Sequence, residues 1–354
     1  MVGAFRTWCQ AGRSPPCRHV RRWPFRAADH DPATRHEHLE VTVIGALRGH
    51  SLCDLDDLSA PALAELLDTA EAMAEVLRRP IPRVPALRGR TVMLLFYEPS
   101  TRTRHSFELA CKALGADSLS LAAATSSVVK GESLLDTMRT TAALGCHAVV
   151  LRHPCSGAAA QAARFTALPV INAGDGTHAH PTQALLDLLT VRRRKGRLDG
   201  LRLTVVGDVL HSRVARSAAT AFRRCGAHVT LCGPETVLPA LAGPALGAQV
   251  CHDLEQALRG ADAVMALRIQ RERQGEGLLP GMAEYRARWG IDRARWERLC
   301  PDAILLHPGP LQRGVELHPD MPDLPQSAIE EQVRAGVAVR MAVLYQLLDG
   351  REAA

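Results

Sequence analysis

Hydroxyl and guanidinium side chains alternate along Ser100-Thr101-Arg102-Thr103-Arg104, where a predicted strand meets a predicted helix. The apolar run Thr91–Phe96 has the length of a buried strand. Residues 104–114 then carry apolar side chains at helical spacing before Gly115, a typical helix stop. Unpaired backbone N–H groups and the helix dipole make the N-terminus of such a helix attractive to anions. We therefore predict that this stretch holds a multiply charged anion, above all a phosphate.

An ordinary structural explanation covers only part of this stretch. Ser100 could be a helix N-cap, and Arg102 and Arg104 could be solvated surface charges. Capping accounts for one hydroxyl, but not for three hydroxyls that alternate with two arginines. We favour the phosphate site.

Further polar residues follow other predicted strands at their carboxyl ends, where parallel α/β sheets bind ligands. They are Arg152, His180, Thr182, Gln183, Arg213, Arg268, Gln270 and the segment His307-Pro308-Gly309-Pro310. Each has an ordinary explanation when taken singly, because a strand-end arginine is usually part of a surface ion pair. Several strand ends that supply cations or amide groups to one crevice are harder to explain in that way.

Predicted strands and helices alternate from about Val41 to the end of the chain. This alternation favours doubly wound parallel sheets, and a second α/β unit begins near Leu201. We expect an α/β fold with two doubly wound parallel-sheet domains, over residues 41–182 and 183–325. A final helix within 326–354 should pack back on the first domain and complete it. Residues 1–40 are expected to be a disordered extension or the product of a non-native start.

Charge and cysteine usage narrow the class of protein. The net charge of +6 arises in residues 1–28, which hold six arginines and no acidic residue, so residues 29–354 balance at 37 basic and 37 acidic residues. That balance argues against a nucleic-acid partner, and no apolar run reaches the length of a membrane span. The ten cysteines form no C-x-x-C pair, which favours reduced thiols in a cytoplasmic protein over disulfides or metal ligands. We expect neither a metal nor a cofactor.

Together these motifs resemble the aspartate/ornithine carbamoyltransferase family, over roughly residues 40 to 350. The matching segments are Ser100-Thr101-Arg102-Thr103-Arg104, Lys130-Gly131-Glu132-Ser133, Arg152-His153-Pro154, His180-Pro181-Thr182-Gln183 with Asp187, Val206-Gly207-Asp208 with Ser212-Arg213, and Arg268-Ile269-Gln270. The resemblance is strongest to the members that use aspartate. It implies two α/β domains with the active site in the cleft between them, assembled as a homotrimer with shared active sites or as a larger assembly.

The resemblance also implies roles for individual residues. Carbamoyl phosphate would be bound by Ser100, Thr101, Arg102, Thr103, Ser126, Lys130, Arg152, His180 and Gln183. Aspartate would be bound by Lys130, Arg213, Arg268, Gln270, Gly309 and Pro310. The catalytic group would be Arg102, Thr103, Lys130, Arg152, His180 and Gln183. Ser126 and Lys130 match loop residues that reach into the active site of a neighbouring subunit.

The implied reaction transfers the carbamoyl group of carbamoyl phosphate to the α-amino group of L-aspartate, in de novo pyrimidine biosynthesis. The products are N-carbamoyl-L-aspartate and phosphate. Such an attack needs no nucleophile from the enzyme when both substrates are held in line. Fixed donors can stabilise the carbonyl oxygen, which gains negative charge in the transition state. The sequence agrees, because it has no Ser–His–Asp signature.

Three alternatives stay open at this point. An ornithine carbamoyltransferase would share the phosphate half, but Arg268 and Gln270 suit a carboxylate better than an ammonium group. Residues 307–310 also lack the His-Cys-Leu-Pro sequence expected of ornithine enzymes. A non-catalytic relative that serves as a scaffold would have lost its charged site residues. A nicotinamide-dependent oxidoreductase would need a Gly-x-Gly-x-x-Gly turn, which is missing after Val206.

Overall fold

The computed structural model of the protein describes residues 47, 50–56, 58–122, 131–270, 278–279 and 281–348. By their contacts, the described residues belong to one unit, Val43–Ala354. The predicted extension 1–40 lies outside the described residues, as do Ser126 and Lys130. Within the described ranges, no helix is both long enough and apolar enough to cross a lipid bilayer.

The first half of the described chain contains a four-stranded parallel sheet. Its strands are β1 (Thr91–Phe96), β2 (Asp117–Ala122), β3 (Ala148–His153) and β4 (Val170–Asp175), in the order β2-β1-β3-β4. The strand order reverses between β1 and β3, and ligands of such sheets bind beyond the strand ends at that point. Phe96 of β1 pairs with Arg152 of β3. The segments that follow these two strands therefore begin side by side.

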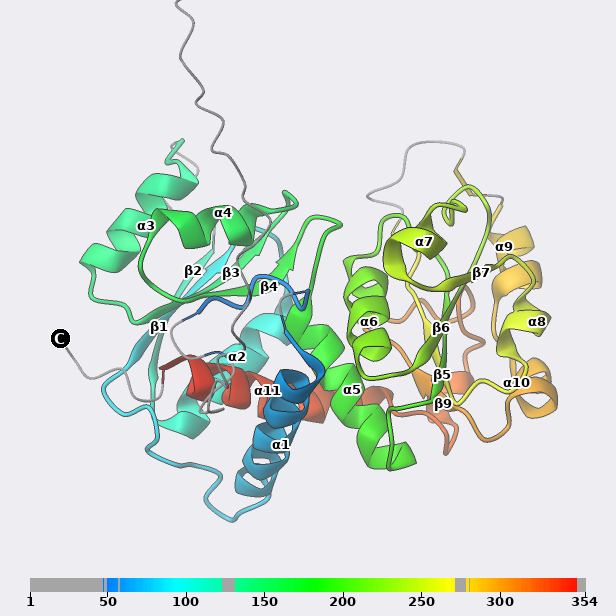
Figure 1. Ribbon diagram of the computed structural model, residues 1–354, viewed down its shortest axis with the longest axis horizontal. Coiled ribbons are helices and arrows are strands. Elements are labelled where there is room, and N and C mark those ends of the chain that lie inside the picture. Colours follow the sequence, from blue (N-terminus) through cyan, green and yellow to red (C-terminus); the bar gives the residue numbers. More distant parts are fainter. Residues whose placement is uncertain are drawn as a thin grey trace, which may run out of the picture. The chain divides into compact units, whose positions relative to one another are not determined.

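Helices cover both faces of this first sheet (Figure 1). They are α1 (Ala60–Leu77), α2 (Thr101–Leu114), α3 (Leu134–Ala143), α4 (Ala158–Phe165), α5 (Pro181–Lys195) and α11 (Ile329–Leu348). Successive side chains of a strand point to opposite faces. Val92 and Leu94 of β1 accordingly join the core formed with α1, α2 and α11, whereas Met93 and Leu95 pack with α3 and α4. Burial on both faces explains the nearly continuous apolar sequence of β1.

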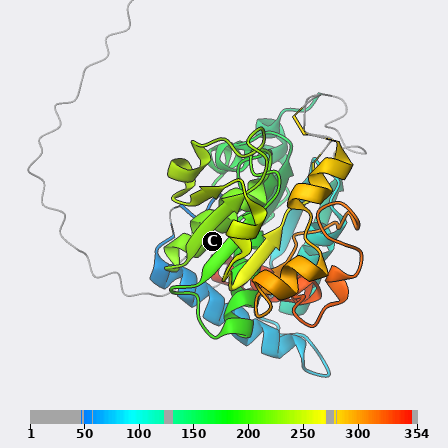
Figure 2. The same ribbon diagram turned by 90° about the vertical axis from the view of Figure 1, so that its right-hand side faces the viewer.

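The second half of the described chain contains a five-stranded parallel sheet. Its strands are β5 (Arg202–Val206), β6 (His228–Cys232), β7 (Gln249–Cys251), β8 (Ala263–Ala266) and β9 (Ile304–Leu306), in the order β7-β6-β5-β8-β9. Its helices are α6 (Arg213–Arg224), α7 (Ala242–Leu246), α8 (Leu254–Leu258), α9 (Met282–Trp289) and α10 (Arg293–Leu299). Figure 2 faces this half and shows α9 and α10, in gold and orange, across the sheet from α6. The strand order reverses between β5 and β8, which creates a second ligand-binding edge.

Helices α5 and α11 contact both halves. Helix α5 packs against β4 and α1 on one side and against α6 and β9 on the other. Helix α11 packs against α1, α2 and α5, so the final helix contacts helices of the first half. Backbone hydrogen bonds also tie the start of α11 to β9. Leu305 N–H donates to Gln326 O over 3.0 Å, and Ala328 N–H donates to Leu305 O over 2.9 Å.

The predicted fold class is confirmed, since the structure contains two doubly wound parallel sheets. The strand and helix predicted around Ser100 are β1 and α2, and the helix ends at Gly115 as expected. Sequence reasoning missed β7 and the short helices α7 to α10. Strand β7 has only three residues, and α7 and α8 have five each. Such segments are too short for a hydrophobic period to be recognised.

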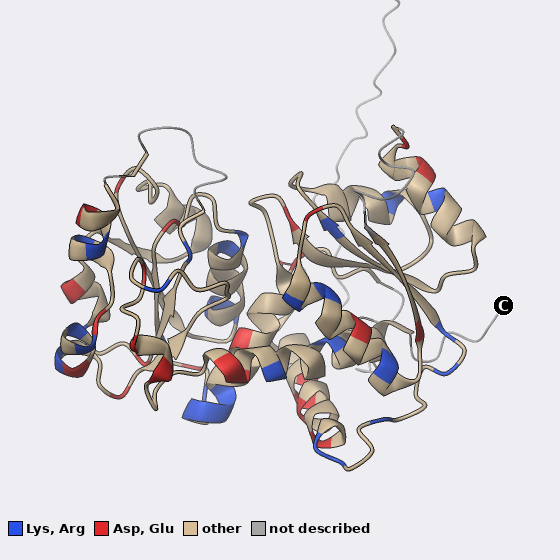
Figure 3. Cartoon of the chain, turned by 180° about the vertical axis from the view of Figure 1, so that it is seen from behind, with Lys and Arg blue, Asp and Glu red and all other residues tan. Residues whose placement is uncertain are grey.

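Basic and acidic side chains are interspersed on both halves of the described chain (Figure 3). This mixture agrees with the charge balance of residues 29–354. Within the described residues, no group of three or more His, Cys, Asp or Glu side chains is arranged to hold a metal ion.

Candidate active site

The turn between β1 and α2 presents a hydroxyl that the helix does not use. Ser100 is the N-cap residue of α2, in an extended conformation with φ −158° and ψ 102°, and its side chain makes no capping hydrogen bond. The explanation of Ser100 as an ordinary N-cap therefore fails, because an ordinary cap accepts from an N–H of the first turn. Thr103, one turn further on, is buried. The helix N-terminus thus combines N–H groups and hydroxyls in the manner of an anion site.

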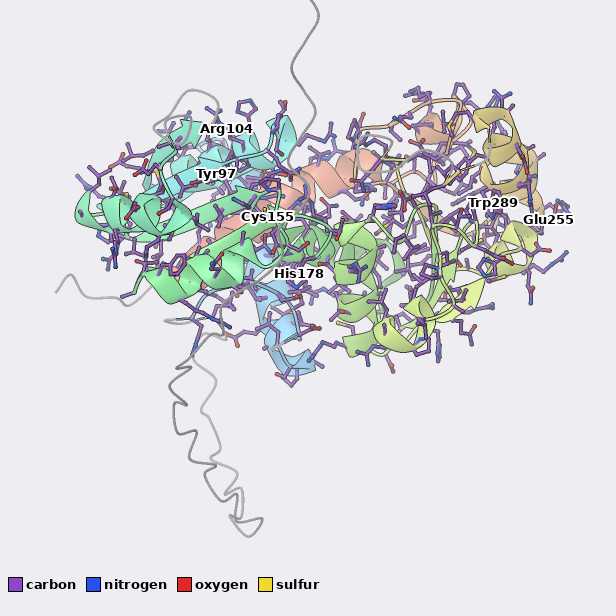
Figure 4. All side chains as sticks on the ribbon, turned by 90° about the horizontal axis from the view of Figure 1, so that it is seen from above. Tyr97, Arg104, Cys155, His178, Glu255 and Trp289 are labelled. Carbon is purple, nitrogen blue, oxygen red and sulfur yellow. The ribbon has the colours of Figure 1, made fainter. Side chains whose placement is uncertain are left out.

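The two arginines of this turn have different surroundings. Arg104 Nε donates to Glu108 Oε1, one turn later on α2, over 3.0 Å. Figure 4 labels Arg104 and also Tyr97, which precedes the turn. The Arg102 guanidinium instead lies against Gly309, because a Cβ on that glycine would be 2.9 Å from Arg102 Cζ. Gly309 has a φ of +66° and precedes Pro310 through a cis peptide bond. Arg102 therefore touches the loop that follows β9, in the other half.

Arg102 also lies within electrostatic reach of Arg268, which follows β8. Burial, and next the positive charge of Arg268, lower the pKa of Arg102. The positive charge of Arg268, in the second half, thus acts on a guanidinium of the first half. The geometry at this point favours a ligand with more than one negative charge.

A second pair of arginines meets at Gly174, at the end of β4. A Cβ there would be 2.9 Å from Arg213 Nε and 3.2 Å from Arg152 Nη1, and the glycine has a φ of +112°. Glu98 joins the pair, with its Oε2 2.9 Å from Arg213 Nη2 and 3.4 Å from Arg152 Nε. Arg213 also donates to Gly176 O over 3.1 Å. Only 7% of its side chain is exposed, so it is not a surface charge.

Glu98 was missed as a site residue by sequence reasoning. It lies directly after β1 and before Ser100, at the carboxyl end of a central strand. Its position could have identified Glu98 as a site residue, because Arg152 and Arg268 were predicted from the same kind of position. Its carboxylate partly neutralises Arg152 and Arg213, which come from opposite halves of the chain.

His180 is a buried, neutral imidazole at the start of α5. Its backbone N–H donates to Ser217 Oγ of α6 over 2.9 Å, and its Nδ1 has no hydrogen-bond partner among the described residues. Burial, and then the charges of Arg152, Arg213 and Arg340, lower the pKa of His180 well below its ordinary value. Near neutral pH the ring can therefore donate one hydrogen bond, but it does not carry a charge.

Gln183, one turn into α5, has a fixed amide orientation. Its Nε2 donates to Asp187 Oδ1 over 3.0 Å, so the amide oxygen is directed elsewhere and can accept from a ligand N–H group. Burial raises the pKa of Asp187 to about 7, against hydrogen bonds from Gln332 and Gln183 that lower it. Asp187 was part of a matching motif, but the sequence assigned it no role.

The structure brings most of the predicted residues to the facing strand ends of the two sheets. On the first half these are Ser100, Thr101, Arg102, Thr103, Arg152, His180 and Gln183. On the second half they are Arg213, Arg268, Gln270, Gly309 and Pro310. Gln270 Nε2 donates to His211 O over 3.4 Å. Ser126 and Lys130 lie outside the described residues, so their predicted place in a neighbouring site stays a prediction.

Two family models match the sequence consecutively. The carbamoyl-phosphate-binding domain of aspartate/ornithine carbamoyltransferases matches residues 50–193, and the aspartate/ornithine-binding domain matches residues 199–347. The chain is also similar to an aspartate carbamoyltransferase catalytic subunit of Pelotomaculum thermopropionicum, at 56% identity over 307 residues that cover 86% of this chain and 98% of the relative. The corresponding subunit of Sorangium cellulosum is 54% identical over 296 residues, which cover 84% and 92% of the two chains.

Solved structures of both branches of the family have a similar fold. The aspartate transcarbamoylase of Trypanosoma cruzi, in complex with N-(phosphonacetyl)-L-aspartic acid, has a TM-score of 0.77 at 30% identity, over 86% of this chain and 98% of that one. The ornithine carbamoyltransferase of Pyrococcus furiosus also has a TM-score of 0.77, at 28% identity over 88% and 100% of the two chains. Fold similarity alone therefore does not distinguish the two branches.

The contrast between Arg102 and Arg104 gives a direct test of the anion site. We expect Arg102→Gln to weaken the binding of inorganic phosphate roughly tenfold to a hundredfold, because a hydrogen bond to a charged group contributes about 1.5–3 kcal/mol. Isothermal titration calorimetry measures this affinity. Arg104→Gln is the matched control, since Arg104 already pairs with Glu108, and it should bind phosphate like the unmodified protein. Equal affinities for the two variants would contradict the site.

Proposed function

This chain belongs to the aspartate/ornithine carbamoyltransferase family, and we propose that it is the catalytic chain of an aspartate carbamoyltransferase whose active site is formed by the strand-end residues described above. It transfers the carbamoyl group of carbamoyl phosphate to the α-amino group of L-aspartate. The observation that carries the site assignment is the contact of the Arg102 guanidinium with Gly309. An arginine of the phosphate turn there reaches the residues proposed to hold the second substrate.

The phosphate half of the site is built on the N-terminus of α2. Ser100, Thr101 and Thr103 would donate hydroxyl hydrogen bonds, and Arg102 would add a guanidinium. Backbone N–H groups of the first helical turn point in the same direction and carry the positive end of the helix dipole. A phosphate bound there is held as a leaving group, because the contacts to its oxygens strengthen as the bond to the carbamoyl carbon breaks.

The carbamoyl group would lie between Arg152, His180 and Gln183. The neutral imidazole of His180 and the Arg152 guanidinium donate to the carbonyl oxygen, which becomes negatively charged when the amine attacks. The Gln183 amide oxygen accepts from the carbamoyl NH₂ group, because its own nitrogen is committed to Asp187. The three contacts define which face of the carbonyl carbon is open to attack.

The reaction itself forms one bond and breaks one. The unprotonated α-amino group of aspartate forms a C–N bond to the carbamoyl carbon, and the C–O bond to phosphate breaks with its electron pair. The proton lost by the amine leaves with the phosphate. We propose that the enzyme provides no covalent intermediate and no separate general base, so its contribution is alignment and stabilisation of the charged oxygen.

Aspartate rather than ornithine is the second substrate. Arg213, Arg268 and Gln270 offer cationic and amide donors for two carboxylates, beside a loop that contains Gly309 and Pro310. An ornithine side chain would bring an ammonium group close to these guanidiniums, at an electrostatic cost. The identities of 56% and 54% to relatives named as aspartate carbamoyltransferase catalytic subunits support the same choice.

We further propose a homotrimer in the cytoplasm. Support for shared sites is the resemblance of Ser126 and Lys130 to the family's loop residues, which implies that they reach into the active site of a neighbouring subunit. Support for a reducing compartment is that buried thiols such as Cys111 and Cys232 are free, and that burial raises the pKa of Cys111 to about 12. An unreactive, protonated thiol of this kind is typical of a structural cysteine.

A substrate comparison tests the proposed function. With carbamoyl phosphate present, aspartate should cause release of phosphate and formation of a carbamoylated product in equal amounts, whereas ornithine at the same concentration should leave both near background. Colorimetric phosphate and ureido assays measure the two products. Faster turnover of ornithine, or no turnover of either amine by protein that binds carbamoyl phosphate, would refute the assignment.

Arg268→Ala separates the two halves of the site. Loss of this guanidinium should raise KM for aspartate at least tenfold, because it removes a charge-assisted hydrogen bond to a carboxylate. The dissociation constant for carbamoyl phosphate should change less than threefold. Arg293→Ala is the control, because Arg293 forms an exposed pair with Glu297 on α10. An equal loss of affinity for both substrates would contradict the proposed role of Arg268.

Sharing of active sites can be measured with mixed subunits. Lys130→Ala and Arg152→Ala should each be nearly inactive alone. After dissociation and reassembly together, some sites would receive an intact Lys130 from one chain and an intact Arg152 from another, and part of the activity should return. Recovery is measured against separately reassembled variants. Confirmed subunit exchange without any recovery would place Lys130 in the site of its own chain.

A further inference from the structure

Gln332, in the first turn of α11, is hydrogen-bonded at both ends of its side-chain amide. Its Nε2 donates to Asp187 Oδ1 on α5 over 2.6 Å. Its Oε1 accepts from the backbone N–H of His307, which follows β9, over 2.9 Å. Only 2% of Gln332 is exposed. A single buried amide therefore joins a helix of the first half to the strand-end loop of the second.

The Asp187 end of this connection leads to the carbamoyl group. Asp187 Oδ1 accepts from Gln332 and also from Gln183 Nε2, at 2.6 Å and 3.0 Å. Both glutamines thus present their amide nitrogen to the same oxygen of Asp187. The amide oxygen of Gln183 is then left for the ligand, and that of Gln332 for His307. Asp187 thus sets the orientation of both glutamines.

The His307 end leads to the aspartate-binding loop. His307 Nδ1 accepts from Gly309 N–H over 2.8 Å, and its Nε2 lies 3.0 Å from Glu316 Oε1. The same Glu316 oxygen accepts from Gln312 N–H over 2.7 Å. His307 and Glu316 are each 2% exposed. These bonds fix the backbone on both sides of Gly309 and Pro310.

We propose that Gln332 is a positioning residue that couples the binding of carbamoyl phosphate to the binding of aspartate. The inference rests on the proposed function and deepens it. Carbamoyl phosphate orders Gln183, which holds Asp187 and, through it, Gln332. Gln332 in turn holds His307 and the loop that lines the aspartate site. Each substrate thereby stabilises the arrangement that the other requires, and the effect must be equal in both directions.

The hydrogen bonds from Gln332 to Asp187 and His307 suggest a role beyond packing, because packing alone would not require polar side chains here. Buried amides and carboxylates cost free energy unless all their groups are paired, and Asp187 Oδ2 has no hydrogen-bond partner among the described residues. An apolar side chain of the same size could fill the space between α5, α11 and β9 at least as well. Gln346, about four turns later on the same helix, provides the comparison. It is also buried, but its Nε2 donates to Thr69 Oγ1 of α1 over 3.0 Å, and this bond stays within the first half.

The test measures coupling rather than activity. Succinate serves as the probe for the aspartate site, because it has two carboxylates and no amine and so does not react. The dissociation constant of succinate is measured by calorimetry with and without saturating carbamoyl phosphate. The ratio of the two constants is the coupling factor. Gln332→Met removes both hydrogen bonds at similar volume, and Gln346→Met is the matched control for loss of a buried amide from α11.

In the unmodified protein, carbamoyl phosphate should strengthen the binding of succinate. In Gln332→Met the coupling factor should fall by roughly fivefold or more. In Gln346→Met it should stay unchanged, whatever the effect of either substitution on the melting temperature. Gln332→Leu is the second variant if Gln332→Met fails to fold. It also removes both hydrogen bonds, so it should likewise reduce the coupling factor.

The outcomes separate this inference from the proposed function. If the unmodified protein binds both ligands but neither affects the other, or if Gln332 and Gln346 variants have the same coupling factor, then Gln332 is only structural and the inference is wrong. If the unmodified protein binds neither carbamoyl phosphate nor succinate, the proposed function fails and the coupling fails with it.

Discussion

The gathering of guanidinium groups at the ends of the two sheets is the feature on which the proposed site depends. Arg102 lies against Gly309 of the second half, and Arg152 and Arg213 meet at the backbone of Gly174. Glu98 contacts Arg152 and Arg213, and so supplies one negative charge to that pair. Guanidinium groups that the fold holds in place are preorganised for anionic ligands. In the proposed site, a phosphate binds at the edge of the first sheet and a dicarboxylate at the edge of the second.

The same charges determine the protonation state of the central histidine. Burial, and then the charges of three arginines, lower the pKa of His180 and so disfavour the charged imidazole. In the proposed site, a neutral ring adds a hydrogen-bond donor for the carbonyl oxygen without adding another positive charge. A lowered pKa also favours this role over that of a general acid. The electrostatics therefore support stabilisation of an oxyanion rather than proton transfer.

Sequence reasoning predicted the parts of the site that local patterns encode. The Ser100 turn was accessible because an apolar run, a helical period and the glycine that ends the helix locate it. The other strand-end residues followed from the rule that parallel sheets bind ligands at their carboxyl ends. Glu98 and Gln332 were not predicted as site residues. Glu98 is part of the site because it pairs with Arg213, which lies 115 residues later in the chain. Gln332 lies in a helix whose alignment with α5 cannot be predicted from its hydrophobic period. Tertiary pairing, rather than residue type, gives these two residues their place in the site.

The route of the last helix explains why two separate sheets can act as one site. The backbone at the start of α11 is tied to Leu305 of β9, while the body of the helix packs on α1 and α2. A displacement of the second sheet therefore has to move, or release, a helix buried in the first half. Gln332 lies in the first turn of α11, between β9 and the part of the helix that packs on the first half. Its two hydrogen bonds therefore depend on the position of Asp187 relative to His307. Packed interfaces of this kind have discrete arrangements rather than a continuous range, so ligands at the two sheet edges can select the same arrangement together.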